Sequence, residues 1–276
     1  MQTKTLLFFT FINFIISSSF ANIGSIASLN ELSDHWEQAN ETTLIIFDVD
    51  EVLITTEDHF SHPYAKYIAL PLMLKFILTS HSKKETENSL SLSYLLTKKI
   101  LIEDFSPSLI KKLQNNRVPV IALTHSATGP LGLIPEATTW KINLLKEYNI
   151  HFSLFEIDRL FIQNASQNKI LPFLEQGVLF AEGHSKGAVL KAFFKQCNFH
   201  PLKVIFIDDS ITNVEDVHFA MTSIGIECLS YQYTGANRFF KKEANKAILT
   251  YQFEYLLEKK QWLTDNEVQK KLSATN

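Results

Sequence analysis

The sequence predicts an α/β fold: a parallel sheet of about five strands flanked by helices, with a small, mostly helical insertion. Short, uninterrupted apolar runs recur along the chain and are typical of strands buried on both faces. Segments with apolar residues three and four apart lie between these runs, as in amphipathic helices. One long stretch after the first run breaks this alternation and is predicted to be the insertion.

The predicted strands are short apolar runs separated by polar segments. Alternation of such runs with helical segments favours the doubly wound, Rossmann-like arrangement, in which the strands are parallel. The runs are LIIF at 44–47, VPVIAL at 118–123, GVLFA at 177–181, KVIFI at 203–207 and GIECLSY at 225–231.

The helical segments carry recognisable end signals. Ser106 is predicted to cap a helix over 106–117, because a proline follows it at a position suited to the first helical turn. Further helices are predicted over 137–149 and 186–197, and the C-terminal 40 residues also look helical. The tetrapeptide TDNE at 264–267 has the pattern of a capping box before the last turns.

Two stretches depart from simple alternation. Residues 54–104 are predicted to form the mostly helical insertion, a candidate cap over the sheet. Residues 125–176 are expected to add a helix and a small hairpin, with Asn164–Lys169 at its turn.

The N-terminus predicts export. An apolar run from Leu6 to Ile16 precedes small residues at Ser19 and Ala21, which fits a signal peptide over 1–21. The run is too short to span a bilayer comfortably, so no membrane span is expected after cleavage. The predicted destination is the periplasm or the exterior, where Cys197 and Cys228 could pair or stay as free thiols.

Polar side chains follow the predicted strands. In open parallel sheets ligands bind beyond the carboxyl ends of the strands, so we expect these side chains to share one site. They are Asp48 and Asp50 after the first strand, Thr124 after the second, Asp208 and Asp209 after the fourth, and Lys186 at a helix start.

This set of side chains suits phosphoryl chemistry. Dense carboxylates must share a cation or a proton, and oxygen ligands without a His/Cys cluster favour Mg²⁺. One carboxylate can then attack phosphorus, and a second, two residues on, can protonate the leaving oxygen and later activate water.

Four segments resemble, in order, the motifs of the haloacid dehalogenase (HAD) superfamily: FDVDEVL, VIALTHS, HSKGAVL and VIFIDDSITNV. The match looks closest to a group of exported bacterial HAD-like phosphatases. It runs from about residue 44 to 214, and its strength comes from four motifs in the right order.

The resemblance implies roles for single residues. Asp48 is the implied nucleophile that forms an aspartyl-phosphate, and Asp50 the general acid/base whose carbonyl also contacts Mg²⁺. Thr124 and Lys186 are implied to bind the phosphoryl group. Its fourth motif makes Asp209 the best metal ligand.

Other residues of the motifs have supporting roles or depart from the family pattern. Asp208 matches a doubled-acid variant and would support the metal, and Asn213 stands where a second acid is common. Glu51 places an unusual charge beside the site, which would lower affinity for an anionic substrate. His125 and His184 flank the site, and each is expected to be a surface histidine.

The predicted activity is hydrolysis of a phosphorylated small molecule. A phosphotransferase of the same fold stays open, because it differs only in its acceptor. So does a secreted binding or effector protein with little turnover. A formal net charge of -3 gives no basic field, and no nucleic-acid partner is expected.

Overall fold

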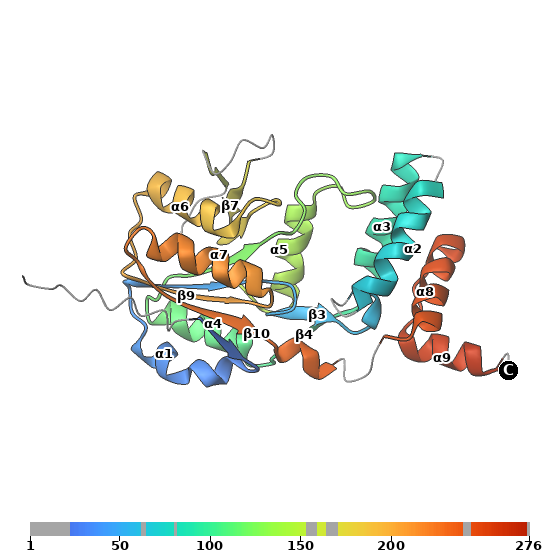
Figure 1. Ribbon diagram of the computed structural model, residues 1–276, viewed down its shortest axis with the longest axis horizontal. Coiled ribbons are helices and arrows are strands. Elements are labelled where there is room, and N and C mark those ends of the chain that lie inside the picture. Colours follow the sequence, from blue (N-terminus) through green and yellow to red (C-terminus); the bar gives the residue numbers. More distant parts are fainter. Residues whose placement is uncertain are drawn as a thin grey trace, which may run out of the picture.

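A computed structural model of the chain describes residues 23–61, 65–79, 82–152, 159–163, 171–239 and 244–274. Within these ranges the α/β fold is confirmed: a mostly parallel sheet has helices on both faces (Figure 1). The sheet order is β1-β10-β9-β2-β5-β8-β7-β6.

The five predicted strands are all present and form the centre of this sheet. They lie side by side in the order β10, β9, β2, β5, β8, and each neighbouring pair is parallel. Their bounds are β2 Thr43–Phe47, β5 Val120–Thr124, β8 Val178–Phe180, β9 Lys203–Asp208 and β10 Glu227–Tyr233.

Additional strands extend both edges, so the expected number of about five was too low. β1 (Ile23–Ile26) pairs in parallel with β10. At the other edge β7 (Phe173–Glu175) and β6 (Leu160–Phe161) run antiparallel and form the predicted hairpin. Its expected turn at 164–169 lies outside the described residues. Edge strands of two to four residues are too short to show a clear apolar pattern.

Side chains of the central strands alternate between two apolar layers. Ile45 and Phe47 face one layer, and Leu44 and Ile46 face the other. This alternation explains why the strands read as continuous apolar runs: both faces are covered. The first layer includes residues of α1 (Ser33–Gln38), α4 (Ser106–Asn115) and α5 (Ala137–Glu147); the second includes α6 (Lys186–Cys197) and α7 (Ile211–Thr222).

Two predicted helix ends had different outcomes. The capping box is confirmed, because Thr264 N donates to Glu267 at 2.7 Å and Glu267 N donates to Thr264 Oγ1 at 3.3 Å. The prediction that Ser106 caps α4 is wrong: Phe105 is the N-cap, and Ser106 is a buried helical residue without a cap bond. Short 3-10 helices cover Leu29–Leu32, His59–Ser61 and Gly235–Phe239.

The stretch predicted as an insertion leaves the sheet and returns through a two-stranded ribbon. β3 (Ile54–Thr56) and β4 (Lys99–Leu101) are antiparallel, and α2 (Lys66–Thr79) and α3 (Lys83–Leu96) lie between them in the chain. The two helices therefore form an excursion from the sheet, and the chain leaves and returns through the paired strands of the ribbon.

The C-terminal helices pack on this excursion, which the sequence did not lead us to expect. α8 (Lys246–Lys259) lies beside α2 and α3, apart from the sheet, and α9 (Asp265–Ala274) packs on α8 (Figure 1). Phe60 and Ala69 from the excursion share an apolar cluster with Leu249, Phe253 and Leu256 of α8. We call α2, α3, α8 and α9 the helical unit.

Polar bonds tie the connection between α8 and α9 to the residues that follow β3. The buried Asp58 accepts hydrogen bonds from Trp262 Nε1 at 2.8 Å and from Asp265 N at 3.0 Å. Burial raises the pKa of Asp58 above its usual value, although these two bonds lower it. His59 Nδ1 lies 2.5 Å from Asp265 Oδ2.

Three expectations concern export and the membrane. The signal peptide predicted over 1–21 falls outside the described residues. None of the helices described here is long and apolar enough to cross a bilayer. The question of the cysteines is settled in favour of free thiols: Cys197 is partly buried and Cys228 fully buried.

Candidate functional site

Asp48 sits at the carboxyl end of β2, on the floor of a pocket. Its backbone N–H donates to the carbonyl of Ile207 at 2.9 Å, which continues the pairing of β2 with β9. Its Oδ1 accepts a hydrogen bond from Val49 N at 2.8 Å. Burial, together with nearby carboxylates such as Asp208, raises the pKa of Asp48 well above its usual value, although Lys186 acts against this.

Lys186 is fully buried and joins two of the predicted carboxylates. Its Nζ lies 2.6 Å from Asp208 Oδ2 and 3.0 Å from Asp48 Oδ1. Burial lowers the pKa of an amine, but the two carboxylates outweigh it, and the pKa of Lys186 is raised. Lys186 is therefore not a solvated surface lysine. The other lysine of the first turns of this helix, Lys191, is exposed and donates to Ser223 Oγ at 3.4 Å.

A close approach of two helices directs Lys186 into the site. The next residue, Gly187, donates its N–H to Asp216 of α7 at 2.9 Å. A Cβ at Gly187 would lie 2.6 Å from the Cβ of Ala220, closer than packed atoms allow. Ser185 caps α6 and bonds the same Asp216 carboxylate. The start of α6 is thereby fixed against α7, and its first side chain points to the strand ends.

Asp208 is engaged mainly as the partner of Lys186. Besides the lysine, it accepts hydrogen bonds from Ser210 N at 2.9 Å and from Asn213 Nδ2 at 3.0 Å, and the residue is fully buried. Asn213, from the first turn of α7, thus holds Asp208. Four donor contacts on its two oxygens leave Asp208 less free to bind a metal than Asp209.

Asp209 completes a group of three carboxylates that suits a divalent cation. One oxygen each from Asp48, Asp208 and Asp209 lie within 4.8 Å of one another. Burial and the charges of Asp208 and Glu51 raise the pKa of Asp209 to about 7. Such crowding is relieved when a cation binds, and an all-oxygen set is what Mg²⁺ prefers. Asp48 and Asp209 are the members that also line the pocket.

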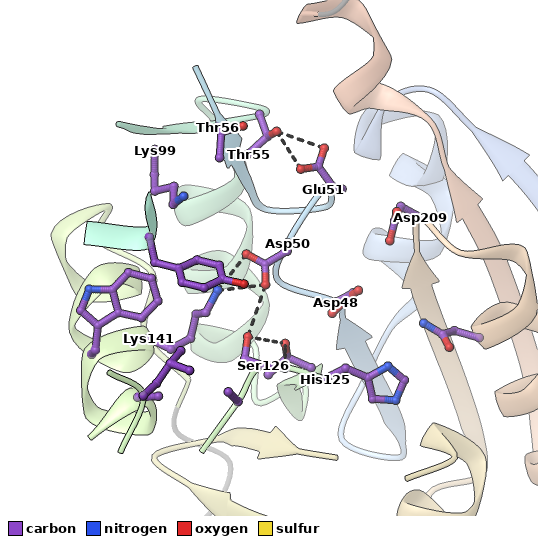
Figure 2. Close-up of a pocket in the computed structure, with 17 residues that line it drawn as sticks. Asp48, Asp50, Glu51, Thr55, Thr56, Lys99, His125, Ser126, Lys141 and Asp209 are labelled. Atoms are coloured by element: carbon purple, nitrogen blue, oxygen red, sulfur yellow. Dashed lines mark hydrogen bonds and ion pairs between the residues drawn. The ribbon is translucent and has the colours of Figure 1, made fainter. Parts of the chain in front are cut away.

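Asp50 faces the same pocket but forms an ion pair that the sequence did not predict. Lys141 Nζ lies 2.8 Å from Oδ1 and 2.9 Å from Oδ2 (Figure 2), and Ser126 Oγ donates at 3.3 Å. The Asp50 side chain is 52% exposed, whereas that of Lys141 is 6% exposed. Desolvation raises the pKa of Asp50, but the charge and hydrogen bonds of Lys141 prevail and lower it.

Thr124 is the last residue of β5, which flanks β2 on the side opposite to β9. Its Oγ1 lies 3.0 Å from Ser126 Oγ and accepts a hydrogen bond from Ser126 N at 3.1 Å. Ser126 also donates to Asp50, so a chain of hydroxyls connects the end of β5 to that carboxylate (Figure 2). Both hydroxyls line the pocket and can bind an oxyanion there.

The pocket has a volume of about 600 Å³. The strand ends form one side, and the ribbon, α3 and α5 form the other (Figure 2). This size accommodates a small organic molecule. The lining residues are Asp48, Asp50, Glu51, Thr55, Thr56, Tyr94, Lys99, Thr124, His125, Ser126, Ala127, Leu131, Ala137, Trp140, Lys141, Asp209 and Asn213.

Glu51 and the two histidines lie beside the site in different environments. Glu51 has a left-handed backbone (φ 63°), and its carboxylate accepts from Thr55 Oγ1 at 2.9 and 3.0 Å. His125 is exposed, as expected, and its Nε2 lies 2.9 Å from the carbonyl oxygen of His184. The expectation that His184 is a surface residue is wrong, because only 3% of it is exposed.

Two lysines of the pocket were missed from the sequence. Lys141 could have been found, because it lies four residues from both Ala137 and Leu145 on the buried side of α5, where a charge is unusual. Lys99 carries no such signal, since it stands in the polar sequence TKK at the edge of a short strand.

Comparisons with known proteins identify the family. Residues 25–269 match the family described as "Protein of unknown function (DUF2608)". The chain belongs to this family. Relatives of this DUF2608 chain include an uncharacterized protein of Rickettsia felis, 26% identical over 81% of each chain. Another is uncharacterized protein RC0398 of Rickettsia conorii, 25% identical over 83% of this chain and 82% of the relative.

One solved structure shows a distant likeness to the DUF2608 chain. It is a HAD family hydrolase from Salmonella enterica subsp. enterica serovar Typhi, with 11% sequence identity and a TM-score of 0.32. The alignment covers 79% of this chain and 80% of that one.

Proposed function

We propose that this chain is a metal-dependent phosphomonoesterase that works through a phospho-Asp48 intermediate. The observation that carries the proposal is the position of Asp48. It lies at a strand end, bound to Lys186 at 3.0 Å and within 4.8 Å of the Asp209 carboxylate, and it opens into a pocket shared with Asp50. The resemblance of four segments to the motifs of the HAD superfamily also supports this proposal.

The proposed reaction has two steps. In the first, an Asp48 carboxylate oxygen forms a bond to phosphorus, the bond to the leaving oxygen breaks, and Asp50 supplies the proton that oxygen needs. In the second, Asp50 takes a proton from water, whose oxygen attacks phosphorus, and the bond to Asp48 breaks. Phosphate is released, and the proton that Asp50 took from water passes to solvent, so that both carboxylates are ionised again.

Neighbouring side chains assist each step. Lys186 holds Asp48 and partly neutralises the negative charge around the phosphoryl group, and Thr124 and Ser126 donate hydrogen bonds to its oxygens. Asp48 and Asp209, with the carbonyl of Asp50, would hold Mg²⁺. When bound, Mg²⁺ neutralises phosphate charge and polarises the phosphorus–oxygen bonds.

Lys141 sets the resting state of Asp50. The ion pair keeps Asp50 ionised, which suits a base in the second step. A phosphate dianion bound beside Asp50 would raise its pKa, because like charges disfavour ionisation. Substrate binding would thereby let Asp50 take up from solvent the proton that it gives to the leaving oxygen in the first step.

The location and partners belong to the same proposal. We infer export to the periplasm or the exterior from the predicted signal peptide over 1–21, and the family match begins after it, at residue 25. The expected partner is a phosphorylated small molecule.

The test uses residues 22–276 and an aryl phosphate. Hydrolysis should require Mg²⁺, stop with a chelator, and disappear in Asp48→Asn. The matched control, Asp104→Asn, changes an exposed carboxylate that does not line the pocket and should retain activity. Activity that survives Asp48→Asn would contradict the proposed nucleophile. Metal binding without turnover would favour the binding or effector alternative, and transfer to an added alcohol would favour a phosphotransferase.

A further inference from the structure

Apart from Lys141, which pairs with Asp50, one side of the pocket has no role in the proposed phosphoryl chemistry. The groups that attack phosphorus or bind metal lie at the strand ends, whereas the opposite side is built by the ribbon, α3 and α5. This opposite side carries an amine, Lys99, and two aromatic rings, Tyr94 and Trp140. Its chemistry therefore concerns the part of the substrate beyond the phosphoryl group.

Lys99 differs from the other two amines of the site. Lys186 is paired with Asp48 and Asp208, and Lys141 with Asp50. Lys99 is half-buried, and within the described part of the chain no carboxylate lies at ion-pair distance from its Nζ. Figure 2 shows its amine turned toward the interior of the pocket.

The backbone of the ribbon determines this direction. Lys99 is paired with Thr56 of β3, and its carbonyl oxygen accepts a hydrogen bond from Tyr148 Oη at 2.5 Å. The preceding residue, Lys98, has a side chain that is 67% exposed and lies 3.1 Å from Glu57. Adjacent side chains of an extended chain point to opposite sides, so Lys98 faces solvent and Lys99 faces the pocket.

The environment of Lys99 is costly without a ligand. Burial lowers its pKa to about 8, because a desolvated ammonium loses hydration, and Lys141 adds repulsion. Asp50, Glu51 and Asp58 act in the opposite direction but do not restore the usual value. An anion bound at this point would supply the missing counter-charge.

The aromatic rings form a wall on the same side of the pocket as Lys99. Tyr94 and Trp140 are packed edge to face, with ring centroids 6.3 Å apart, and both line the pocket. Such a wall favours a flat or apolar group over a strongly hydrated one. The pocket volume of about 600 Å³ leaves room for a flat or apolar group between the strand ends and Lys99.

We propose that Lys99 forms a second anion-binding subsite, and that the preferred substrate is a phosphomonoester whose leaving group carries another anionic group on a planar or apolar scaffold. This inference rests on the proposed function for the hydrolysis step, but the subsite itself is a binding property. The second anion pairs with the Lys99 ammonium while the scaffold packs on Tyr94 and Trp140.

The experiment compares substrates that differ in one charge. The purified protein with Mg²⁺ is given 3- and 4-carboxyphenyl phosphate and the matching neutral carbamoylphenyl phosphates. We expect kcat/KM to be about tenfold higher for at least one carboxylate than for its amide, as a hydrogen bond to a charged group provides. Lys99→Met should lower that ratio about tenfold, and Lys98→Met should preserve it.

The quantity compared is the ratio of kcat/KM for the carboxylate to kcat/KM for its amide, because a general defect lowers kcat/KM for both substrates together. If the wild-type protein shows no preference for either carboxylate, the subsite is refuted. It is also refuted if Lys99→Met lowers both members of a pair and keeps their ratio.

A binding measurement separates this inference from the proposed function. Calorimetry with Mg²⁺ compares benzylphosphonate with its 3- and 4-carboxy derivatives, which cannot be hydrolysed. Tighter binding of a carboxy compound that depends on Lys99 supports the subsite even if no aryl phosphate is turned over, in which case the proposed function alone fails. Equal binding, or no binding of any phosphonate, overturns the subsite.

Discussion

Replacing Lys186 by methionine should destabilise the fold by about 3–5 kcal/mol, because it leaves buried carboxylates without their cation. Lys186 Nζ lies 2.6 Å from Asp208 and 3.0 Å from Asp48, and the side chains of Lys186 and Asp208 are fully buried. Methionine has a similar length and is itself apolar, so the lost charge dominates the change. Single domains have total stabilities of about 5–15 kcal/mol, so the loss is large but measurable.

The assay is urea unfolding in chelator, followed by far-UV circular dichroism at pH 7. The slope of the unfolding free energy against urea should stay unchanged while the midpoint falls. Lys191→Met is the control, because Lys191 is exposed on the same helix. It should change the stability by less than about 0.5 kcal/mol.

A second variant tests the physical cause. Lys186→Met combined with Asp208→Asn removes both members of the closer ion pair and keeps an acceptor for Ser210 N. The combined loss should be smaller than the sum of the single losses by about 1–3 kcal/mol, as for directly interacting residues. If Lys186→Met costs no more than Lys191→Met, or if the losses add, the lysine is not holding the carboxylates in the way described.

Three further outcomes follow from the same structure. Metal affinity should weaken as pH falls below the Asp209 pKa of about 7, by about tenfold per pH unit, because a proton competes for this carboxylate. The stability of the fold should depend on pH in the same direction. A raised carboxyl pKa stabilises the metal-free fold in acid, and this stabilisation is lost as pH rises through 7. Mg²⁺ should therefore raise Tm more at pH 8 than at pH 5.5. Lys141→Met should raise the pKa of Asp50 and move the alkaline limb of the kcat/KM profile, which reports the proton donor of the first step, to higher pH, since the removed cation lies 2.8 Å away; an unmoved limb would mean that Asp50 is not the acid. Phe253→Ala should cost about 3–5 kcal/mol of packing in the helical unit, because Phe253 is buried and stacks on Phe60. Hydrogen exchange should then quicken in α2 and α8 while β2 and β9 stay protected; equal quickening throughout would contradict a separate helical cluster.

Much of the sheet could be read from the sequence because its strands are buried on both faces. Each of the five apolar runs became a strand, and the helix over 186–197 was placed at its observed bounds. The edge strand β1 was missed, since four residues at an edge do not require an apolar pattern. The capping of α4 was misread because Ser106 fits a cap in the chain but is buried by its neighbours.

For the candidate site, the positions of Asp48, Thr124 and Asp209 followed from one rule: parallel strands end at the same edge. Their proximity was therefore expected, and so was that of Lys186 at a helix start. The different environments of Asp208 and Asp209 were not expected. They depend on which of the two carboxylates pairs with Lys186 and accepts the hydrogen bond from Asn213.

The sequence alone determined the parallel sheet, its strand ends and the residues that meet there, because apolar runs and backbone geometry act locally. Only the tertiary structure decided that Lys141 pairs with Asp50, that Lys99 faces the pocket, and that α8 and α9 pack on an excursion more than a hundred residues earlier in the chain. These contacts join side chains from distant segments. They are selected by the total burial and charge balance of the folded chain, which no local pattern records.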